Sequence, residues 1–308
     1  MNDLILHHYD SSPFAEKVRL MLGYKSLAWT SVKVPRIMPK PDVVALTGGY
    51  RRTPFLQIGA DIYCDTALIA RVLEARQPGP SLFPTSAPLA PMLAHWADST
   101  LFWTVIPYTM QPAGAAAMFA GSPPEAIKAF AADRAPFTAT MKRLTVPDAT
   151  AQLQGYLAAL ERQLQLGHPW LCGAEASIAD FSVAHCLWFF RRVPPVAGIL
   201  TPFPALSAWL DTMLALGHGR PEPMSSEDAV RLAAETVGFA ATEVLPGLGF
   251  EPGQAVSVAA TDYGVDPVAG TLAGLSATEV VLRRQDPRAG TVHVHFPRIG
   301  YQLKADPT

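Results

Sequence analysis

Short apolar runs and longer amphipathic stretches alternate along the first 80 residues. Four runs are short enough for strands, and two stretches have the apolar spacing of helices. The strand-like runs are 4–7, 29–34, 55–58 and 62–64, and the helix-like stretches are 13–22 and 66–76. A glycine-containing turn, Gly59 to Asp61, joins the last two runs, so those strands should be antiparallel. The pattern predicts a β-α-β unit, a proline-rich connection and a β-β-α unit, which together form a mixed sheet covered by helices.

The rest of the chain divides into two regions with different patterns. Residues 85–245 are helical almost throughout, and their clearest helix start is a capping box, Ser177 to Asp180, ahead of an apolar run. The second region contains five short runs of alternating polarity, separated by turn signals. These runs are 256–260, 268–273, 280–284, 291–296 and 301–303. We therefore expect an all-α domain at 85–245 and a small all-β, barrel-like (SH3-like) domain at 250–305.

The composition of the chain restricts its partners and its location. A formal net charge of -2 over 308 residues implies no strong attraction to nucleic acid or to anionic membranes. The chain starts without a signal-like segment, and no stretch of about 18 residues is apolar throughout, so we expect a cytoplasmic protein. Three widely spaced cysteines, Cys64, Cys172 and Cys186, indicate buried thiols rather than disulfides.

Ser12 stands at the start of the first predicted helix, in the stretch HYDSSPFAEKVRLML. It directly precedes Pro13, a residue type favoured at the first helical position, so Ser12 can cap the helix and stabilise it by about 1 kcal/mol. The same position, where a strand meets a helix N-terminus, also favours a bound anion such as a thiolate. From the residues alone, both roles stay open.

Three short motifs follow one another at the starts of predicted elements. They are Ser12-Pro13-Phe14, Thr53-Pro54-Phe55 and Asp65-Thr66. In this order they resemble the thioredoxin-like half of the cytosolic glutathione S-transferases, and the capping box resembles that of the superfamily's central C-terminal helix. The resemblance covers residues 1–220 and is nearest to the tau and omega classes, with Ser12 at the position of the omega-class catalytic cysteine.

The resemblance implies a glutathione transferase fold. Residues 1–80 would form a thioredoxin-like, glutathione-binding α/β domain, followed by the all-α domain at 85–245. The barrel-like domain at 250–305 has no counterpart in the common classes. We expect it to pack on the helical domain or to take part in an oligomer, and the resemblance implies a homodimer.

The resemblance also implies a binding site for glutathione as co-substrate. Ser12 would be the catalytic residue, with Ser11 in reserve. The glutathione-binding residues would be Phe14, Lys40, Thr53, Pro54, Asp65 and Thr66. Asp65 would face the γ-glutamyl ammonium, a cis Pro54 would turn Thr53 toward the cysteinyl part, and Lys40 would pair with the glycine carboxylate.

Activation of the glutathione thiol requires a definite free energy. A free thiol has a pKa near ~8.5, and lowering it by ~2 units requires about 2.7 kcal/mol. A helix terminus supplies ~0.3–1 kcal/mol and a hydrogen bond to a charged group ~1.5–3 kcal/mol, so the Ser12 hydroxyl would provide most of it. A serine here argues against thiol–disulfide exchange and dehydroascorbate reduction, which need a cysteine.

The first helices of the all-α domain carry aromatic residues suited to a hydrophobic co-substrate. Trp96, Trp103 and Tyr108 are the candidates for this electrophile site. We expect a glutathione transferase whose thiolate attacks a hydrophobic electrophile, in a conjugation, elimination or isomerisation. The alternative is a non-catalytic binding or scaffolding protein that uses the barrel-like domain for a partner. Neither function involves nucleic acid or a membrane.

Two histidine pairs are the candidates for metal binding. His7 and His8 fall on opposite faces of one predicted strand, whereas His293 and His295 share a face. Because no third ligand lies nearby in sequence, neither pair predicts a metal site.

Overall fold

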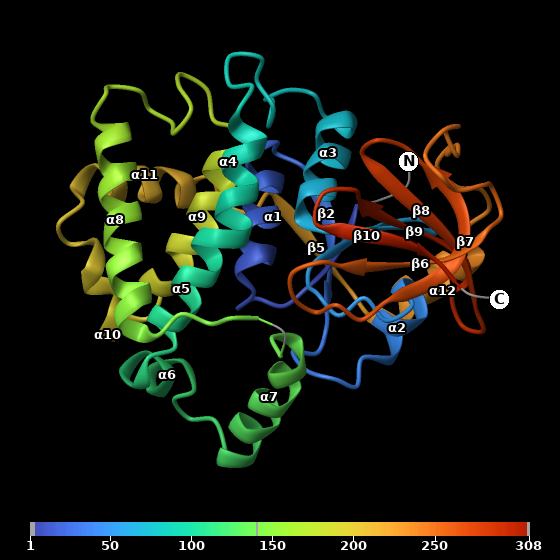
Figure 1. Cartoon of the computed structure of the whole chain (residues 1–308), viewed down its shortest axis with the longest axis horizontal. Helices are drawn as coiled ribbons and strands as arrows, with labels where there is room; N and C mark the ends of the chain where they lie inside the picture. The colour runs from blue at the N-terminus through green and yellow to red at the C-terminus, as the bar shows by residue number, and fades with distance from the viewer. Residues whose placement is uncertain (1–3, 140, 307–308) are drawn as a thin grey trace.

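The computed structural model describes residues 4–139 and 141–306, and its N-terminal part is a mixed sheet flanked by helices (Figure 1). The elements are β1 (Ile5–His8), α1 (Pro13–Tyr24), β2 (Ala28–Lys33), α2 (Pro41–Thr47), β3 (Phe55–Ile58), β4 (Asp61–Cys64) and α3 (Thr66–Arg76). Strand β1 pairs in parallel with β2 and antiparallel with β3, and β3 pairs antiparallel with β4. The predicted β-α-β unit, β-β-α unit and hairpin are confirmed.

A group of helices packs beside α1, away from the strands (Figure 1). The elements are α4 (Ala90–Trp96), a π-helical turn (Ala97–Leu101), α5 (Phe102–Thr109), α6 (Pro112–Met118), α7 (Pro124–Phe137), α8 (Val146–Leu164), α9 (Ile178–Arg191), α10 (Pro194–Ala197), a 3-10 turn (Gly198–Leu200) and α11 (Pro204–Ala215). Helix α9 is central, because it packs against α1, α4, α5 and α11. Its predicted capping box is formed, with the Ser177 amide donating to Asp180 Oδ2 at 2.9 Å.

The segment 220–235 differs from the helical expectation. It forms a strand, β5 (Arg220–Met224), followed by helix α12 (Ser226–Glu235). Strand β5 pairs in parallel with β2, and α12 packs against β2, β9 and α2. Pro221 and Pro223 are compatible with this strand because β5 is the edge of the sheet, where one row of amides needs no partner. Residues 220–235 therefore belong to the sheet and its covering helices, not to the helical group.

The C-terminal extension contains all five predicted strands. They are β6 (Ala255–Ala260), β7 (Val268–Leu275), β8 (Glu279–Asp286), β9 (Gly290–Pro297) and β10 (Tyr301–Ala305), which pair antiparallel with one another. Strand β9 also pairs in parallel with β4. The whole described chain thus has one ten-stranded sheet in the order β10-β6-β7-β8-β9-β4-β3-β1-β2-β5.

The extension contacts the helical domain, as expected, through Tyr263 on Trp103 and Phe137, but its main attachment is to the N-terminal sheet. It continues the N-terminal sheet through the β4–β9 pair. Without β9, strand β4 would end that sheet with a row of unpaired amides and carbonyls, and pairing with β9 satisfies this edge. In Figure 1 the strands of the extension lie on the right, away from α8–α11 on the left.

Two hydrophobic cores lie on opposite faces of this sheet. Tyr63 packs into a large core shared with α1, α3 and the helical group, whereas its neighbours Ile62 and Cys64 pack into a second core with α2, α12 and the extension. Alternate residues of β4 thus pack into different cores, as the pleat of a strand requires.

Within the described residues, no helix has the length and apolarity needed to span a membrane.

Candidate active site

Ser12 lies at the junction of β1 and α1. Its hydroxyl accepts a hydrogen bond from the Ala15 amide at 3.2 Å, which makes Ser12 the N-cap of α1. The same hydroxyl donates to the Thr53 carbonyl at 3.3 Å. Ser12 and Ser11 both line one large pocket. The capping role is therefore formed, and the hydroxyl group sits in the wall of a pocket.

Thr53 and Pro54 connect this position to the sheet. The peptide bond between them is cis, as expected, and Phe55 directly after them begins β3. Thr53 borders two pockets: the large one beside Ser12, of about 690 Å³, and a smaller one of about 170 Å³ that Pro54 also lines.

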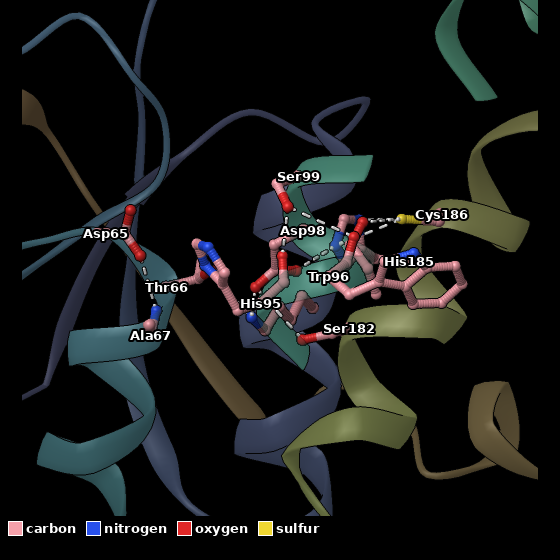
Figure 2. A network of polar contacts seen from close by, with 12 residues as sticks. Asp65, Thr66, Ala67, His95, Trp96, Asp98, Ser99, Ser182, His185 and Cys186 are labelled. Atoms are coloured by element: carbon pink, nitrogen blue, oxygen red, sulfur yellow. Dashed lines mark hydrogen bonds and ion pairs between the residues drawn. The ribbon is translucent and has the colours of Figure 1, made fainter. Parts of the chain in front are cut away.

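Asp65 and Thr66 stand at the start of α3, on the wall of the smaller pocket. Asp65 has a φ of 78°, an unusual value for a residue with a side chain, and its Oδ1 accepts a hydrogen bond from the Ala67 amide at 2.9 Å (Figure 2). Its Oδ2 accepts from the Tyr301 hydroxyl at 3.0 Å. The Thr66 hydroxyl accepts from Lys17 Nζ at 3.1 Å. Asp65 and Thr66, the residues predicted to contact the γ-glutamyl group, thus both have hydrogen-bond partners within the chain.

Arg52 separates the two pockets, together with a tyrosine from the extension. Phe14, Arg52, Thr53 and Tyr263 border both pockets. The Arg52 guanidinium lies 3.9 Å from the centre of the Tyr263 ring and donates to Asp262 and to the Tyr263 carbonyl. A cation against an aromatic ring and beside a carboxylate is held in place by both. The extension therefore forms part of the pocket walls.

The large pocket is strongly cationic. Six cationic side chains line it: Arg36, Arg51, Arg52, Arg134, Lys142 and Arg143. No aspartate or glutamate is among its described lining residues. Outside the lining, Asp133 pairs with both Arg51, at 2.9 Å, and Arg134, at 3.0 Å, so one carboxylate is shared by two cations. An excess of positive charge remains, which favours an anionic ligand.

The three aromatic candidates for the electrophile site occupy different places. Trp103 lines the large pocket and packs edge-on against Tyr263. Trp96 lines neither pocket and packs against Tyr156 at 5.1 Å. Tyr108 also lines neither, and its hydroxyl donates to the Val196 carbonyl at 2.7 Å.

Lys40 lies away from the other predicted glutathione-binding residues. It is a buried residue at the start of α2 and lines neither pocket. Burial, together with the nearby positive charges of Arg134 and Arg51, lowers the pKa of Lys40 to about 8, although Asp133 acts in the opposite direction. A contact between Lys40 and the glycine carboxylate of glutathione would need a ligand that extends beyond the smaller pocket.

A buried polar network begins in the wall of the smaller pocket, which Lys17 and Asp98 line, and continues into the helical group (Figure 2). Lys17 is fully buried, and its Nζ lies 2.6 Å from Asp98 Oδ2. Asp98 Oδ1 is 2.9 Å from His185 Nε2, and the Ser182 hydroxyl is 3.4 Å from Oδ2. Burial opposes ionisation of Asp98, but Lys17 and His185 outweigh it and hold the pKa of Asp98 below its usual value. Because Lys17 also donates to Thr66, the network connects α3 to the helical group.

Sequence reasoning missed several residues of these pockets, among them Lys17, Arg52, Tyr263 and Tyr301. Lys17 follows Phe14 by three positions, so helical periodicity alone could have placed both on the same face of α1. Arg52 adjoins the Thr53-Pro54 motif. The two tyrosines carry no local signal, because they reach the site only through the pairing of distant strands.

A group of metal-ligand side chains lies outside both pockets. His293 and His295 share a face of β9, as expected, and Asp61 of β4 lies beside them. No third ligand lies nearby in sequence, but strand pairing supplies one from a remote part of the chain.

Comparisons with known proteins identify the relatives of this chain. Residues 6–81 match the family model for the glutathione S-transferase N-terminal domain, and residues 129–212 match the model for the glutathione S-transferase C-terminal domain. The solved structure of a GST-like protein from Pseudomonas syringae is 42% identical, with a TM-score of 0.81. The match covers 99% of this chain and 100% of that chain, so it includes the C-terminal extension.

More distant solved structures share the fold. A tau-class glutathione S-transferase from mango is 17% identical over 69% of this chain and 89% of its own, with a TM-score of 0.51. A glutathione S-transferase from Methylobacillus flagellatus with GSH bound is 18% identical over 71% of this chain and 100% of its own, with a TM-score of 0.50. None of the curated proteins compared with the chain matches it.

Proposed function

This chain belongs to the glutathione S-transferase superfamily, and we propose that it is a transferase in which Ser12 stabilises the thiolate of glutathione for attack on an aromatic anion. The observation that carries the proposal is the lining of the large pocket. Ser12, several aromatic residues and six cationic side chains all line it. The expected hydrophobic electrophiles are therefore restricted to those that carry a negative charge. On family grounds, we include a homodimer and a cytoplasmic location in the proposal.

Glutathione would occupy the smaller pocket and reach Ser12 with its cysteinyl part. The internal hydrogen bonds of Asp65 and Thr66 leave room for it. A carboxylate offers about four lone-pair sites, and Asp65 uses one for Ala67 and one for Tyr301, so it can still accept from the γ-glutamyl ammonium. The Thr66 hydroxyl accepts from Lys17 and can still donate to the γ-glutamyl carboxylate.

Ser12 would exchange one hydrogen bond when the thiolate arrives. Its hydroxyl now donates to the neutral Thr53 carbonyl over 3.3 Å. A neutral hydrogen bond contributes about 0.5–1.5 kcal/mol, whereas one to a charged group contributes about 1.5–3 kcal/mol, so donation to a thiolate is preferred. The Ala15 amide can continue to donate to the serine oxygen throughout. The cap and the catalytic role are then compatible.

The reaction would be a substitution at an electrophilic aromatic carbon. The thiol proton leaves to solvent, the sulfur forms a bond to the ring carbon, and a leaving group such as chloride departs with the bonding electrons. Arginine side chains in the large pocket would bind an anionic substituent of the ring. The serine supports this tau-type chemistry over the omega-type chemistry of a catalytic cysteine.

One observation supports the alternative, a non-catalytic binding or scaffolding protein. The side chains of Ser12, Asp65 and Thr66 all have partners within the chain, and each has one outside the local helix caps. A protein that had lost glutathione binding would keep such internal contacts. The alternative predicts that glutathione does not react, whether or not it binds.

Glutathione binding and conjugation of 4-chloro-3-nitrobenzoate, measured in the wild type, separate the two functions. We expect binding by calorimetry, and a loss of about 30- to 100-fold in kcat/KM in Ser12→Ala, since about 2–2.7 kcal/mol of thiolate stabilisation disappears. Ser11→Ala is the matched control and should keep full activity. Binding without conjugation in the wild type would support the non-catalytic alternative, and absence of binding would refute the assigned glutathione site. A loss in Ser11→Ala alone would move the catalytic role to Ser11.

The anion preference is tested with the uncharged methyl ester of the same substrate. The double variant Arg36→Gln/Arg143→Gln should lower kcat/KM for the benzoate by about 10-fold or more and leave the ester nearly unaffected. Arg162→Gln/Lys304→Gln removes two positive charges outside the pocket and serves as the control. Equal losses for the benzoate and the ester would refute an anionic substrate.

A further inference from the structure

Three side chains able to bind a metal converge where the extension joins the N-terminal sheet. The parallel β4–β9 pair places Asp61 opposite His293 and Tyr63 opposite His295. Because alternate residues of a strand share a face, Asp61 and both histidines lie on the same face. His295 Nε2 is 2.9 Å from Asp61 Oδ1, and His293 Nδ1 is 3.9 Å from the same oxygen. One donor atom from each residue lies within 4.8 Å of the other two.

We propose that Asp61, His293 and His295 form a zinc site that joins the extension to the N-terminal sheet. Zinc binds imidazole nitrogen and carboxylate oxygen at about 2.0–2.2 Å, so two ligands of a tetrahedral ion lie roughly 3.3 Å apart. The two distances to Asp61 Oδ1 lie on either side of this value. Small side-chain movements would therefore bring the three donor atoms to an ion, with water as the fourth ligand.

His293 provides an independent observation that points to a ligand at this place. The residue is 8% exposed, and its Nδ1 is buried without a hydrogen-bond partner. A buried polar atom left unpaired costs about 1–3 kcal/mol. The Phe239 ring stacks on the imidazole at 3.9 Å and holds it with Nδ1 directed toward Asp61. A zinc ion would satisfy this nitrogen.

Glu279 completes the arrangement from outside. Its Oε1 lies 2.7 Å from His295 Nδ1, on the side of the ring opposite Asp61. A carboxylate that accepts from one nitrogen of a histidine fixes the tautomer, so that the other nitrogen can bind a metal. The Ala240 amide orients the Asp61 carboxylate by donating to Oδ2 at 2.8 Å, so that Oδ1 is the oxygen that would bind the metal. Both ligands therefore have an orienting partner.

The donor set and its location indicate the kind of ion and its role. Two imidazoles and one carboxylate suit zinc better than magnesium or calcium, which prefer oxygen ligands. The carboxylates of Asp61 and Glu279 add two negative charges close to His295, which a dication would balance. None of the three ligands lines either pocket. The role is structural, since the ion would link β4 to β9 across the junction.

The test uses full-length protein without a histidine tag. The protein is treated with a chelator, incubated with zinc chloride and desalted, and bound zinc is measured by elemental analysis. We expect one zinc ion per wild-type chain and a higher melting temperature with zinc than without. His293→Ala should retain no zinc, whereas His168→Ala, which removes an exposed histidine, should behave like wild type. Tetrahedral cobalt absorption should appear in wild type and not in His293→Ala.

A second variant keeps the test informative if His293→Ala fails to fold. Glu279→Gln retains all three ligands and should weaken zinc affinity about 10- to 100-fold. Wild-type protein that holds no zinc after desalting would overturn the proposal, as would zinc binding that is unchanged in both variants. The cluster would then be a buried ion-pair network only. Glutathione binding is not needed for any of these measurements.

Discussion

Replacing Asp98 with asparagine should destabilise the protein by about 3–5 kcal/mol, the usual loss when one partner of a buried ion pair is removed. Asparagine keeps the size of the side chain and a hydrogen bond to His185, but it leaves the fully buried Lys17 ammonium without its counter-charge at 2.6 Å. With an unfolding entropy of about 2.1 cal/mol/K per residue over 308 residues, each kcal/mol lowers the melting temperature by about 1.5 °C, so we expect a decrease of about 5–8 °C.

A double-mutant cycle isolates the electrostatic part of this loss. Lys17→Met removes the ammonium, and Lys17→Met/Asp98→Asn removes both charges. If the buried pair is responsible, the double variant should be more stable than the sum of the single losses predicts, by about 2 kcal/mol or more. Differential scanning calorimetry of the four proteins measures this. A decrease of less than about 2 °C for Asp98→Asn, or simple additivity, would refute this account of Lys17 burial.

Two further predictions concern pH and packing. Burial lowers the pKa of His7 to about 4 despite its hydrogen bond to Gln57, so the unfolded chain binds the proton more tightly, and stability present above pH 6.5 should be lost as the pH falls toward 4. Between pH 7 and pH 5 this loss is about 2 kcal/mol, and thermal unfolding of His7→Gln should show a correspondingly weaker pH dependence. Gly23→Ala should destabilise by about 1–3 kcal/mol in the same assay, because a Cβ there would lie 2.1 Å from the Gly217 carbonyl oxygen; unchanged stability would show that the two backbones separate freely.

Most of the fold could be predicted because its signals are local. The caps at Ser12 and Ser177, the turn at Gly59 and the alternation of residues 250–305 depend only on neighbours in sequence. Strand β5 could not be found in this way. Its sequence, Arg220 to Met224, contains two prolines and mostly exposed side chains, so only pairing with β2 makes it a strand.

The candidate site was predictable only in part, for a related reason. Its motifs at the starts of α1, β3 and α3 were recognised because each one begins an element. The partners that complete it come from far along the chain, since Tyr301 contacts Asp65 across 236 positions. The separate histidine cluster depends on the same kind of contact, because His295 contacts Asp61 across 234 positions. Such contacts depend on which strands pair, and the alternation of polar and apolar residues in β9 does not reveal its neighbour in the sheet.

The pairing of β4 with β9 has a consequence for how the chain folds during synthesis. Strand β9 begins about 230 residues after β4 ends, and β5 reaches β2 after the helical group. At a translation rate of ~5–20 residues per second, β4 waits about 11–46 s for its neighbour after it leaves the ribosome. The first sheet to emerge thus stays open at both edges while most of the polypeptide is made, and it is completed only when the last strands arrive.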